Sequence, residues 1–189
     1  MPYIPPPELA AMSLAELAQA AAERRLPPID QWTPAHNGDS LMRIAADGAW
    51  YHDGGAITRP AMVRAFSTLL VRDADGAHYL RTPVENLSIV VEDAAFIATD
   101  MQVRHDDAGR PVLAFRLNTD DIILAGADHP LRTAGTADVP AFYVAVRHGT
   151  EARLNRSTYG QLIDYALTLS SSEALAVHSA GVHFALTPA

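Results

Sequence analysis

The sequence predicts an α+β fold of two related halves, each a β-meander with a helix, preceded by a short N-terminal helix. Three observations support this prediction. Asp-Gly steps separate short apolar stretches, two helical patterns recur at a fixed spacing, and a helix-capping signal stands near the start of the chain. The 189 residues are enough for one domain of ordinary size or for two small ones.

The first predicted element is a short helix over residues 13–25. Ser13 and Glu16 are spaced as a capping box, in which each side chain accepts from the backbone N–H of the other residue. The segment is rich in helix formers but thinly apolar, so we expect a marginal helix that leans on the rest of the chain or frays. Residues 1–27 are therefore assigned to an N-terminal tail.

The predicted first half begins at residue 28 and carries the strongest turn signals. Two Asp-Gly steps, at residues 47–48 and 53–54, separate apolar stretches, a pattern typical of tight hairpins. Thr58 is placed to cap a following helix with Pro60 in its first turn, where the missing proline N–H costs little. The apolar residues of that helix recur at helical spacing and predict one buried face. They are Met62, Phe66, Leu69 and Leu70.

The predicted second half, residues 87–189, contains further strands and a final helix. Apolar or alternating stretches predict strands within residues 77–81, 87–91, 94–103, 111–118, 141–147 and 152–155, the first of them still in the first half, residues 28–86. Residues 125–140 are predicted to form a long loop, and residues 156–169 a helix. A Ser-Ala-Gly break between two alternating stretches favours a closing hairpin in the tail.

A shift of 97 residues superimposes the pattern around the second helix on that around the first. It pairs Arg59 with Arg156 and Ile57 with Leu154, and it matches the apolar face of one helix to that of the other. The match favours an internal duplication of a strand–turn–strand–helix unit. Apolar periodicity by itself is the alternative source of the match, because few of the paired residues are identical.

Composition excludes several kinds of chemistry. Cysteine is absent, which removes disulfides, thiol nucleophiles and thiolate metal sites, and all fourteen basic side chains are arginine. The formal net charge of −8 argues against binding to a nucleic-acid backbone. The eight histidines show no metal-ligand spacing, so no metal and no cofactor are predicted.

The start of the chain lacks the basic residues and apolar run of a secretion signal. No apolar stretch approaches the roughly 20 residues that span a bilayer. We therefore expect no membrane span and a cytoplasmic location.

The first candidate site is an anion site built on Arg59 and Arg156. Arginine is disfavoured in the first turn of a helix, where the partial charge is already positive, yet both predicted helices carry one there. Arginine beside free helix N–H groups suits a phosphate or carboxylate. Arg64 lies one turn further along, and Asn155 and Thr82 are candidate hydrogen-bonding neighbours. The alternative is that each arginine pairs with a nearby carboxylate or is simply solvated.

The second candidate site uses carboxylates as general acid or base, with or without magnesium. Glu85, Asp93 and Asp120 are the candidates. Neighbouring residues on a strand point to opposite faces, so Glu92-Asp93 and Asp120-Asp121 cannot act as pairs without a bulge. The alternative for Asp93 and Asp120 is a role in strand-end turns, where aspartate caps backbone donors.

Several segments together resemble a bacterial family described as domain of unknown function 1285, over residues 27–187. They are IDQW, GDSLMRIAADGAWYHDGGAITRPAMVRAFSTLL, RTPVENLSIVVEDAAFIA, NTDDII, LNRSTY and HSAGVHFAL. The resemblance implies an α+β fold with internal duplication, whose second half is a pleckstrin-homology-like, partly open barrel closed by a helix. It also implies a nucleotide-type ligand at the interface between the halves and a role in signal transduction. Ala180 stands where a second glycine is expected in the closing hairpin, which leaves that turn's geometry open.

The functional prediction is therefore a non-enzymatic protein that binds an anionic small molecule of nucleotide type between its two halves. Two alternatives stay open. The carboxylates predict a hydrolase if they converge in a pocket. A pleckstrin-like half also fits a protein-interaction adaptor, whose sign would be a broad exposed apolar patch.

Overall fold

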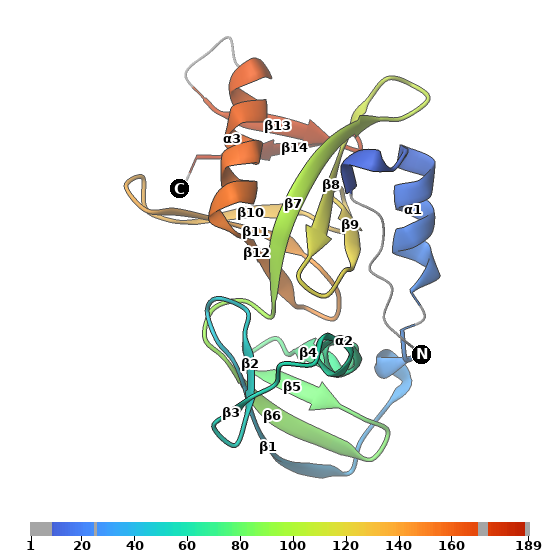
Figure 1. Cartoon of the computed structure of the whole chain (residues 1–189), viewed down its shortest axis with the longest axis vertical. Coiled ribbons are helices and arrows are strands. Elements are labelled where there is room, and N and C mark those ends of the chain that lie inside the picture. The colour runs from blue at the N-terminus through green and yellow to red at the C-terminus, as the bar shows by residue number, and fades with distance from the viewer. Residues whose placement is uncertain (1–8, 25, 170–173, 188–189) are drawn as a thin grey trace.

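In the computed structural model the chain forms two six-stranded sheets, one in each half (Figure 1). The structure describes residues 9–24, 26–169 and 174–187. The first sheet has the order β3-β2-β1-β6-β5-β4, in which β1 and β6 are parallel. In chain order, the strands of this sheet and the helix between them are β1 (His36–Ile44), β2 (Trp50–His52), β3 (Gly55–Ala56), α2 (Pro60–Ser67), β4 (Leu70–Arg72), β5 (His78–Arg81) and β6 (Glu85–Val91).

The second sheet has the order β10-β11-β12-β7-β8-β9, in which β12 and β7 are parallel. In chain order, the strands of this sheet and the helix after them are β7 (Phe96–His105), β8 (Pro111–Leu117), β9 (Ile122–Leu124), β10 (Leu131–Gly135), β11 (Pro140–Ala145), β12 (Glu151–Leu154) and α3 (Arg156–Leu169). The hairpin of β13 (Ala176–Ser179) and β14 (Val182–Ala185) follows.

The two sheets have the same strand order when β1–β6 are matched to β7–β12. In each, the first and last strands pair in parallel at the centre, and three-strand meanders extend to both sides. The α+β fold with duplicated halves is thus confirmed. The second sheet does not close into a barrel along the described residues, and α3 follows its last strand, as expected.

The helices do not follow the same duplication. α2 lies between the third and fourth strands of its sheet, whereas α3 comes after the sixth strand. The strand–turn–strand–helix unit occurs in both halves, but β3 is an edge strand and β12 is central. The shift of 97 residues therefore pairs two helices that have different places in the sheet order.

Three local expectations need correction. The expected boundary at residue 86 falls inside β6, which pairs with β1 and β5 in the first sheet. The expected loop 125–140 contains β10, an edge strand that lacks apolar alternation but pairs along its length with β11. Thr58 does not cap α2: the N-cap is Arg59, without a side-chain cap hydrogen bond.

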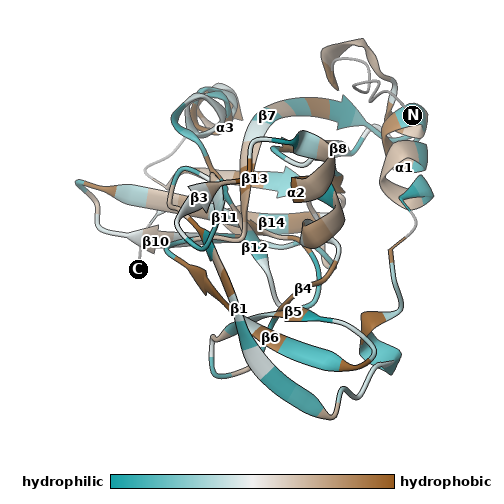
Figure 2. Cartoon of the chain, turned by 60° about the horizontal axis from the view of Figure 1, so that its bottom comes forward, coloured by the Kyte–Doolittle hydropathy of each residue, from teal (hydrophilic) through white to brown (hydrophobic). Residues whose placement is uncertain are grey.

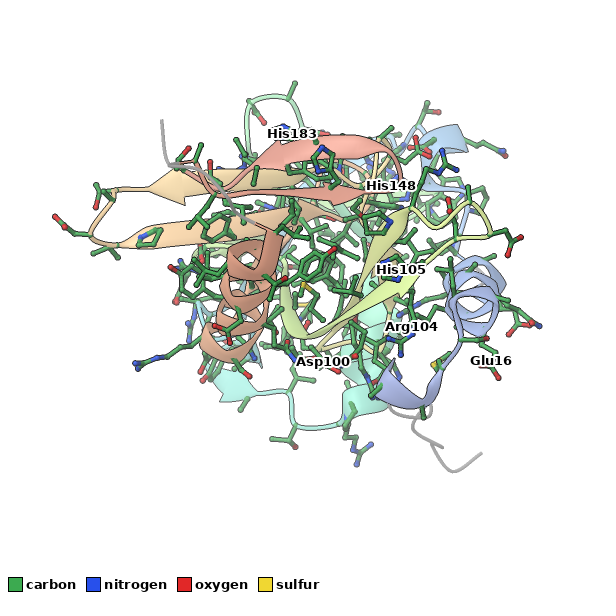
Figure 3. The ribbon with its side chains drawn as sticks, turned by 90° about the horizontal axis from the view of Figure 1, so that it is seen from above. Glu16, Asp100, Arg104, His105, His148 and His183 are labelled. Atoms are coloured by element: carbon green, nitrogen blue, oxygen red, sulfur yellow. The ribbon has the colours of Figure 1, made fainter. Side chains whose placement is uncertain are left out.

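The N-terminal helix α1 (Leu14–Glu23) forms as predicted and lies beside β8 and β9 (Figure 1). Its capping box is complete, with Ser13 N donating to Glu16 Oε2 at 2.7 Å. Leu17 is fully buried in a small cluster that includes Ile122 of β9. Arg104 of β7 (Figure 3) donates to the carbonyl oxygens of Leu9, Ala10 and Met12, in the segment that precedes α1. The helix is therefore held by burial at one face and by an arginine at its start.

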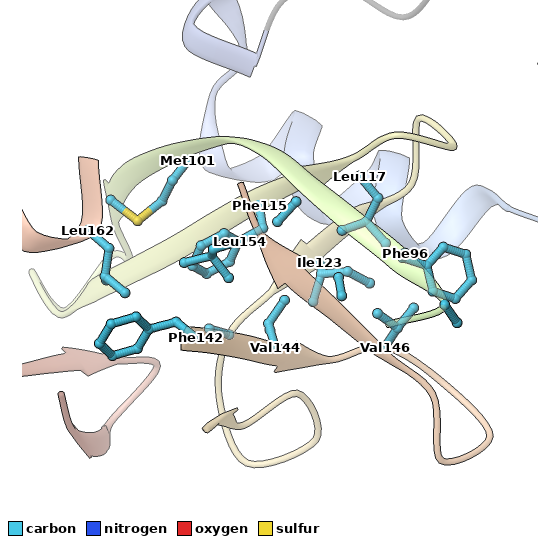
Figure 4. Packing of buried hydrophobic residues seen from close by; sticks show 14 of the residues in the cluster. Phe96, Met101, Phe115, Leu117, Ile123, Phe142, Val144, Val146, Leu154 and Leu162 are labelled. Carbon is cyan, nitrogen blue, oxygen red and sulfur yellow. The ribbon is translucent and has the colours of Figure 1, made fainter. Parts of the chain in front are cut away.

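The main core lies inside the second half and continues into the first. Its largest buried side chains include Phe96, Phe115 and Phe142, which fill the space between the strands of the second sheet (Figure 4). In the first half Trp50 is 2% exposed and stacks on Phe66 of α2, with ring centroids 6.5 Å apart. No helix among the described residues is long and apolar enough to cross a membrane.

Two glycine turns bring the halves into close contact. Gly48, in the β1–β2 turn, has φ +86°, and a Cβ there would lie 2.7 Å from Ile97 of the second half. Gly149, in the β11–β12 turn, has φ +76°, and a Cβ there would lie 2.4 Å from the carbonyl oxygen of Arg72 in the first half. The Arg72 N–H also donates to His148 O at 2.9 Å. Both positions therefore need glycine for its conformation and for its lack of a side chain.

Gly149→Ala is expected to lower the free energy of unfolding by about 3 kcal/mol, because it adds left-handed strain and a clash with a backbone atom. Gly109→Ala is the matched control, since Gly109 has φ +75° but nothing within 4 Å of an added Cβ. Gly109→Ala should lower the free energy of unfolding by about 1 kcal/mol. Urea unfolding measures both, and equal losses would contradict the close interface contact.

Candidate functional site

A buried cluster of arginine and aspartate joins the two halves. At its centre is Asp121, whose side chain is 5% exposed and forms ion pairs with Arg24 and Arg147. The Thr119 hydroxyl donates to Asp121 Oδ2 at 2.6 Å. The carboxylate is thus held by the segment after α1, by the β11–β12 turn and by its own loop.

The two arginines also reach the first half. Arg24 Nη2 donates to Arg64 O at 3.3 Å and to the Ser67 hydroxyl at 3.4 Å, both at the end of α2. Arg147 Nη2 donates to Ser67 O at 3.2 Å, and its guanidinium lies over the Phe96 ring. Burial lowers the pKa of Arg147, an effect that the nearby Asp121 opposes. The cluster therefore links the N-terminal segment, α2 and the second sheet through one carboxylate.

The neighbouring Asp120 has a different environment. It adopts a left-handed conformation with φ +64° and lies between Arg116, at 2.8 Å, and Arg64, at 3.5 Å. Burial and the charge of Asp121 raise its pKa. The structure thus brings together two of the predicted site residues, Arg64 and Asp120, as an ion pair across the halves.

Asp121→Asn is expected to lower the free energy of unfolding by about 3 kcal/mol or more, because it leaves two partly buried arginines without their carboxylate. Asp120→Asn is the matched control, since asparagine tolerates the left-handed conformation, and the ion pairs that it removes are more exposed to water than those of Asp121. The control should change stability by less than about 1 kcal/mol. Urea unfolding of the two variants measures both free energies. A larger loss of stability in Asp120→Asn than in Asp121→Asn would refute the central place of Asp121 in the cluster.

A cleft of about 520 Å³ lies where the β1–β2 turn of the first half meets the start of α3. The first half contributes Ala46 and Asp47, and the second half contributes the rest, including Arg153, Asn155 and Arg156. Asn155 caps the helix, with its Oδ1 accepting from Thr158 N at 2.8 Å. The Arg156 side chain is exposed and makes no hydrogen bond or ion pair to the described part of the chain. The cleft therefore has an uncommitted cation on its rim.

Aromatic and amide side chains form the rest of the cleft. The Phe142 and Tyr159 rings have centroids 5.4 Å apart, and both line it. Asn118 lines it as well; its Oδ1 accepts from Ile97 N at 3.0 Å, so its amide nitrogen is the part left for a ligand. Arginine, amide and aromatic surface thus converge in one cavity.

Asp93 positions the second arginine of this cleft. Its carboxylate accepts from Arg153 Nη1 and from the Tyr143 hydroxyl, each at 2.7 Å. Burial and the hydrogen bond to Asp93 raise the pKa of Tyr143. Arg132 covers the Tyr143 ring at 4.3 Å and holds Glu151 through two 2.8 Å hydrogen bonds. Asp93 is therefore a structural anchor for Arg153.

The remaining predicted site residues lie elsewhere. Arg59 is exposed at the start of α2, its side chain has no partner among the described residues, and it does not line the cleft. Thr82 forms a local turn, in which its hydroxyl accepts from Glu85 N at 3.0 Å. Glu85, Asp93 and Asp120 thus sit in three separate environments. In the part of the chain that the structure describes, no three metal-ligating side chains gather.

Sequence reasoning missed the buried cluster: it did not single out Arg24 or Arg147, and it considered Asp121 only as the neighbour of Asp120. Arg147 ends an apolar stretch, a position where a cation is uncommon, and this was the available signal. Sequence reasoning also missed the cleft that Arg153, Asn118, Phe142 and Tyr159 line, because strand pairing brings these residues together from distant segments.

Comparison with known families adds a decisive observation. The N-terminal domain of DUF1285, a domain of unknown function, matches residues 27–94, and the C-terminal domain of DUF1285 matches residues 95–186. The chain belongs to the DUF1285 family. A DUF1285 protein of Silicibacter pomeroyi DSS-3 is 38% identical, with a TM-score of 0.77 over 94% of this chain and 96% of that one.

A second DUF1285 protein, from Shewanella baltica OS155, is 21% identical and has a TM-score of 0.54 over 66% of this chain and 91% of that one. At this identity the likeness concerns the fold alone. No curated protein matches the chain.

Proposed function

We propose that this DUF1285 protein binds an anionic small molecule of nucleotide type in the cleft between the β1–β2 turn and α3. The observation that carries the proposal is Arg156, an exposed arginine without a partner among the described residues, on the rim of a cleft that also contains aromatic rings. An arginine without a carboxylate is free to bind a phosphate.

The cleft supplies both kinds of contact that a nucleotide needs. Arg156 provides an unpaired charge for a phosphate group, whereas Arg153 is held by Asp93. The backbone N–H groups at the start of the fourteen-residue α3 also favour a negative ligand. Tyr159, which is partly exposed and packs on the buried Phe142 ring, provides aromatic surface for a base. The volume of about 520 Å³ lies within the range of small-molecule sites.

The position of the cleft supports a coupling between ligand and protein conformation. The first half contributes the β1–β2 turn to the cleft and the second half contributes Arg156, so a ligand in the cleft would contact both halves. Such a ligand changes the free energy of the contact between the halves, which is what a role in signal transduction requires. The carboxylate hydrolase has no comparable support, because its three candidate residues do not share a pocket.

Arg156→Gln is expected to weaken binding of the responding nucleotide by about tenfold or more, because it removes a charge-assisted phosphate contact. A thermal-shift screen with ATP, GTP, cyclic dinucleotides and inorganic pyrophosphate first selects the ligand, and calorimetric titration then measures its affinity. Arg59→Gln is the matched control, since it also removes an exposed arginine at a helix start, outside the cleft.

Equal affinity in Arg156→Gln and the unmodified chain, or an equal loss in Arg59→Gln, would refute the placement of the site. A panel without any stabilising anion would refute the ligand class.

A further inference from the structure

A second pocket of about 600 Å³ lies wholly within the first half, between α2 and the strands β1, β2, β5 and β6. Eight of its twelve lining residues are apolar. They include Ile57, Met62 and Phe66, and much of the α2 ribbon has the brown tones of hydrophobic residues in Figure 2. The pocket shares no lining residue with the cleft between the halves.

Leu41, on the rim of this pocket, has an unfavourable backbone conformation. Its φ of +55° lies in the left-handed region, which leucine rarely adopts. It sits in an irregularity of β1 where the pairing with β6 shifts register between Asp39 and Met42. Two hydrogen bonds hold the conformation: Leu41 N donates to Asp39 Oδ1, and Asp53 N donates to Leu41 O. Strained residues on strand irregularities concentrate at functional sites.

The strain does not serve to bury the leucine. The Leu41 side chain is 58% exposed, and Met62 across the pocket is 40% exposed. Glycine or asparagine would fit this backbone position better, and neither would expose an apolar side chain. A leucine is favourable here when an apolar molecule covers it.

The polar groups of the pocket define the kind of molecule. The Ser40 and Thr82 hydroxyls and the Asp39 carboxylate already bind backbone groups. His52 is the polar lining side chain that has no partner among the described residues. The lining contains no arginine, and Asp39 repels anions. We propose that this pocket binds an uncharged, mostly apolar small molecule with one hydrogen-bonding group. The molecule packs against Leu41, and its hydrogen-bonding group contacts His52.

The probe for this proposal is N-phenyl-1-naphthylamine, an uncharged aromatic amine that fluoresces when it leaves water. Its 8-sulfonate has the same rings with a negative charge. In a titration of the full chain, the neutral probe is expected to bind one to one, at least about tenfold more tightly than the sulfonate. Similar affinities for the two probes would overturn the proposed ligand class.

Leu41→Gly is the decisive variant, because it removes the side chain and relieves the strain. It is expected to weaken binding of the neutral probe by about tenfold, without lowering the midpoint of urea unfolding. Val84→Ser is the matched control: Val84 is 61% exposed in the same half but outside the pocket, and its replacement should leave the affinity unchanged. Unchanged binding in Leu41→Gly would overturn the proposal.

Two further outcomes separate this proposal from others. If sedimentation shows a dimer that the probe or Leu41→Gly dissociates, a second copy of the chain fills the groove, and the small-molecule proposal is overturned. Arg156→Gln should leave probe binding unchanged, so the apolar pocket and the proposed anion cleft can fail independently.

Discussion

The arrangement of the two halves depends on one buried carboxylate. Asp121 accepts from the Thr119 hydroxyl and pairs with Arg24 and Arg147, and both arginines continue to Ser67 at the end of α2. A buried charge is tolerated only when its partners are in place, so this cluster permits few other arrangements of the same elements. Glycine turns on both sides of the interface reinforce the contact by letting the two backbones approach.

The interface also determines what the cleft can bind. Because the β1–β2 turn is held against Ile97 and Asn118, it forms one wall of the cleft beside α3. The opposite side is ordered by Asp93, which fixes Arg153 and leaves Arg156 uncommitted. Two arginines that are three residues apart therefore differ in role, one bound to the protein and the other available to a ligand. The apolar pocket of the first half is built independently of this interface.

Local patterns were sufficient to predict much of the fold. The capping box of α1 and the Asp-Gly turns involve neighbouring residues, and the structure contains both. Ala180 departs from the family pattern, yet it adopts the left-handed conformation with φ +48° that a glycine would take. Partners distant in sequence were not predictable: β10 is defined by pairing with β11, and Arg24 pairs with Asp121, which lies in the other half of the chain. Arg59 and Arg156 look equivalent in sequence, and only the packing around each separates a solvated arginine from one on a cleft.

The most direct test of this account is whether the two halves unfold as one unit. Both tryptophans, Trp32 and Trp50, lie in the first half, so their fluorescence follows that half alone, whereas far-UV circular dichroism follows the whole chain. The account predicts coincident urea unfolding curves from the two signals, with one midpoint and one slope. Separate midpoints would show that the halves are stable without each other, and would contradict the central role of the Asp121 interface.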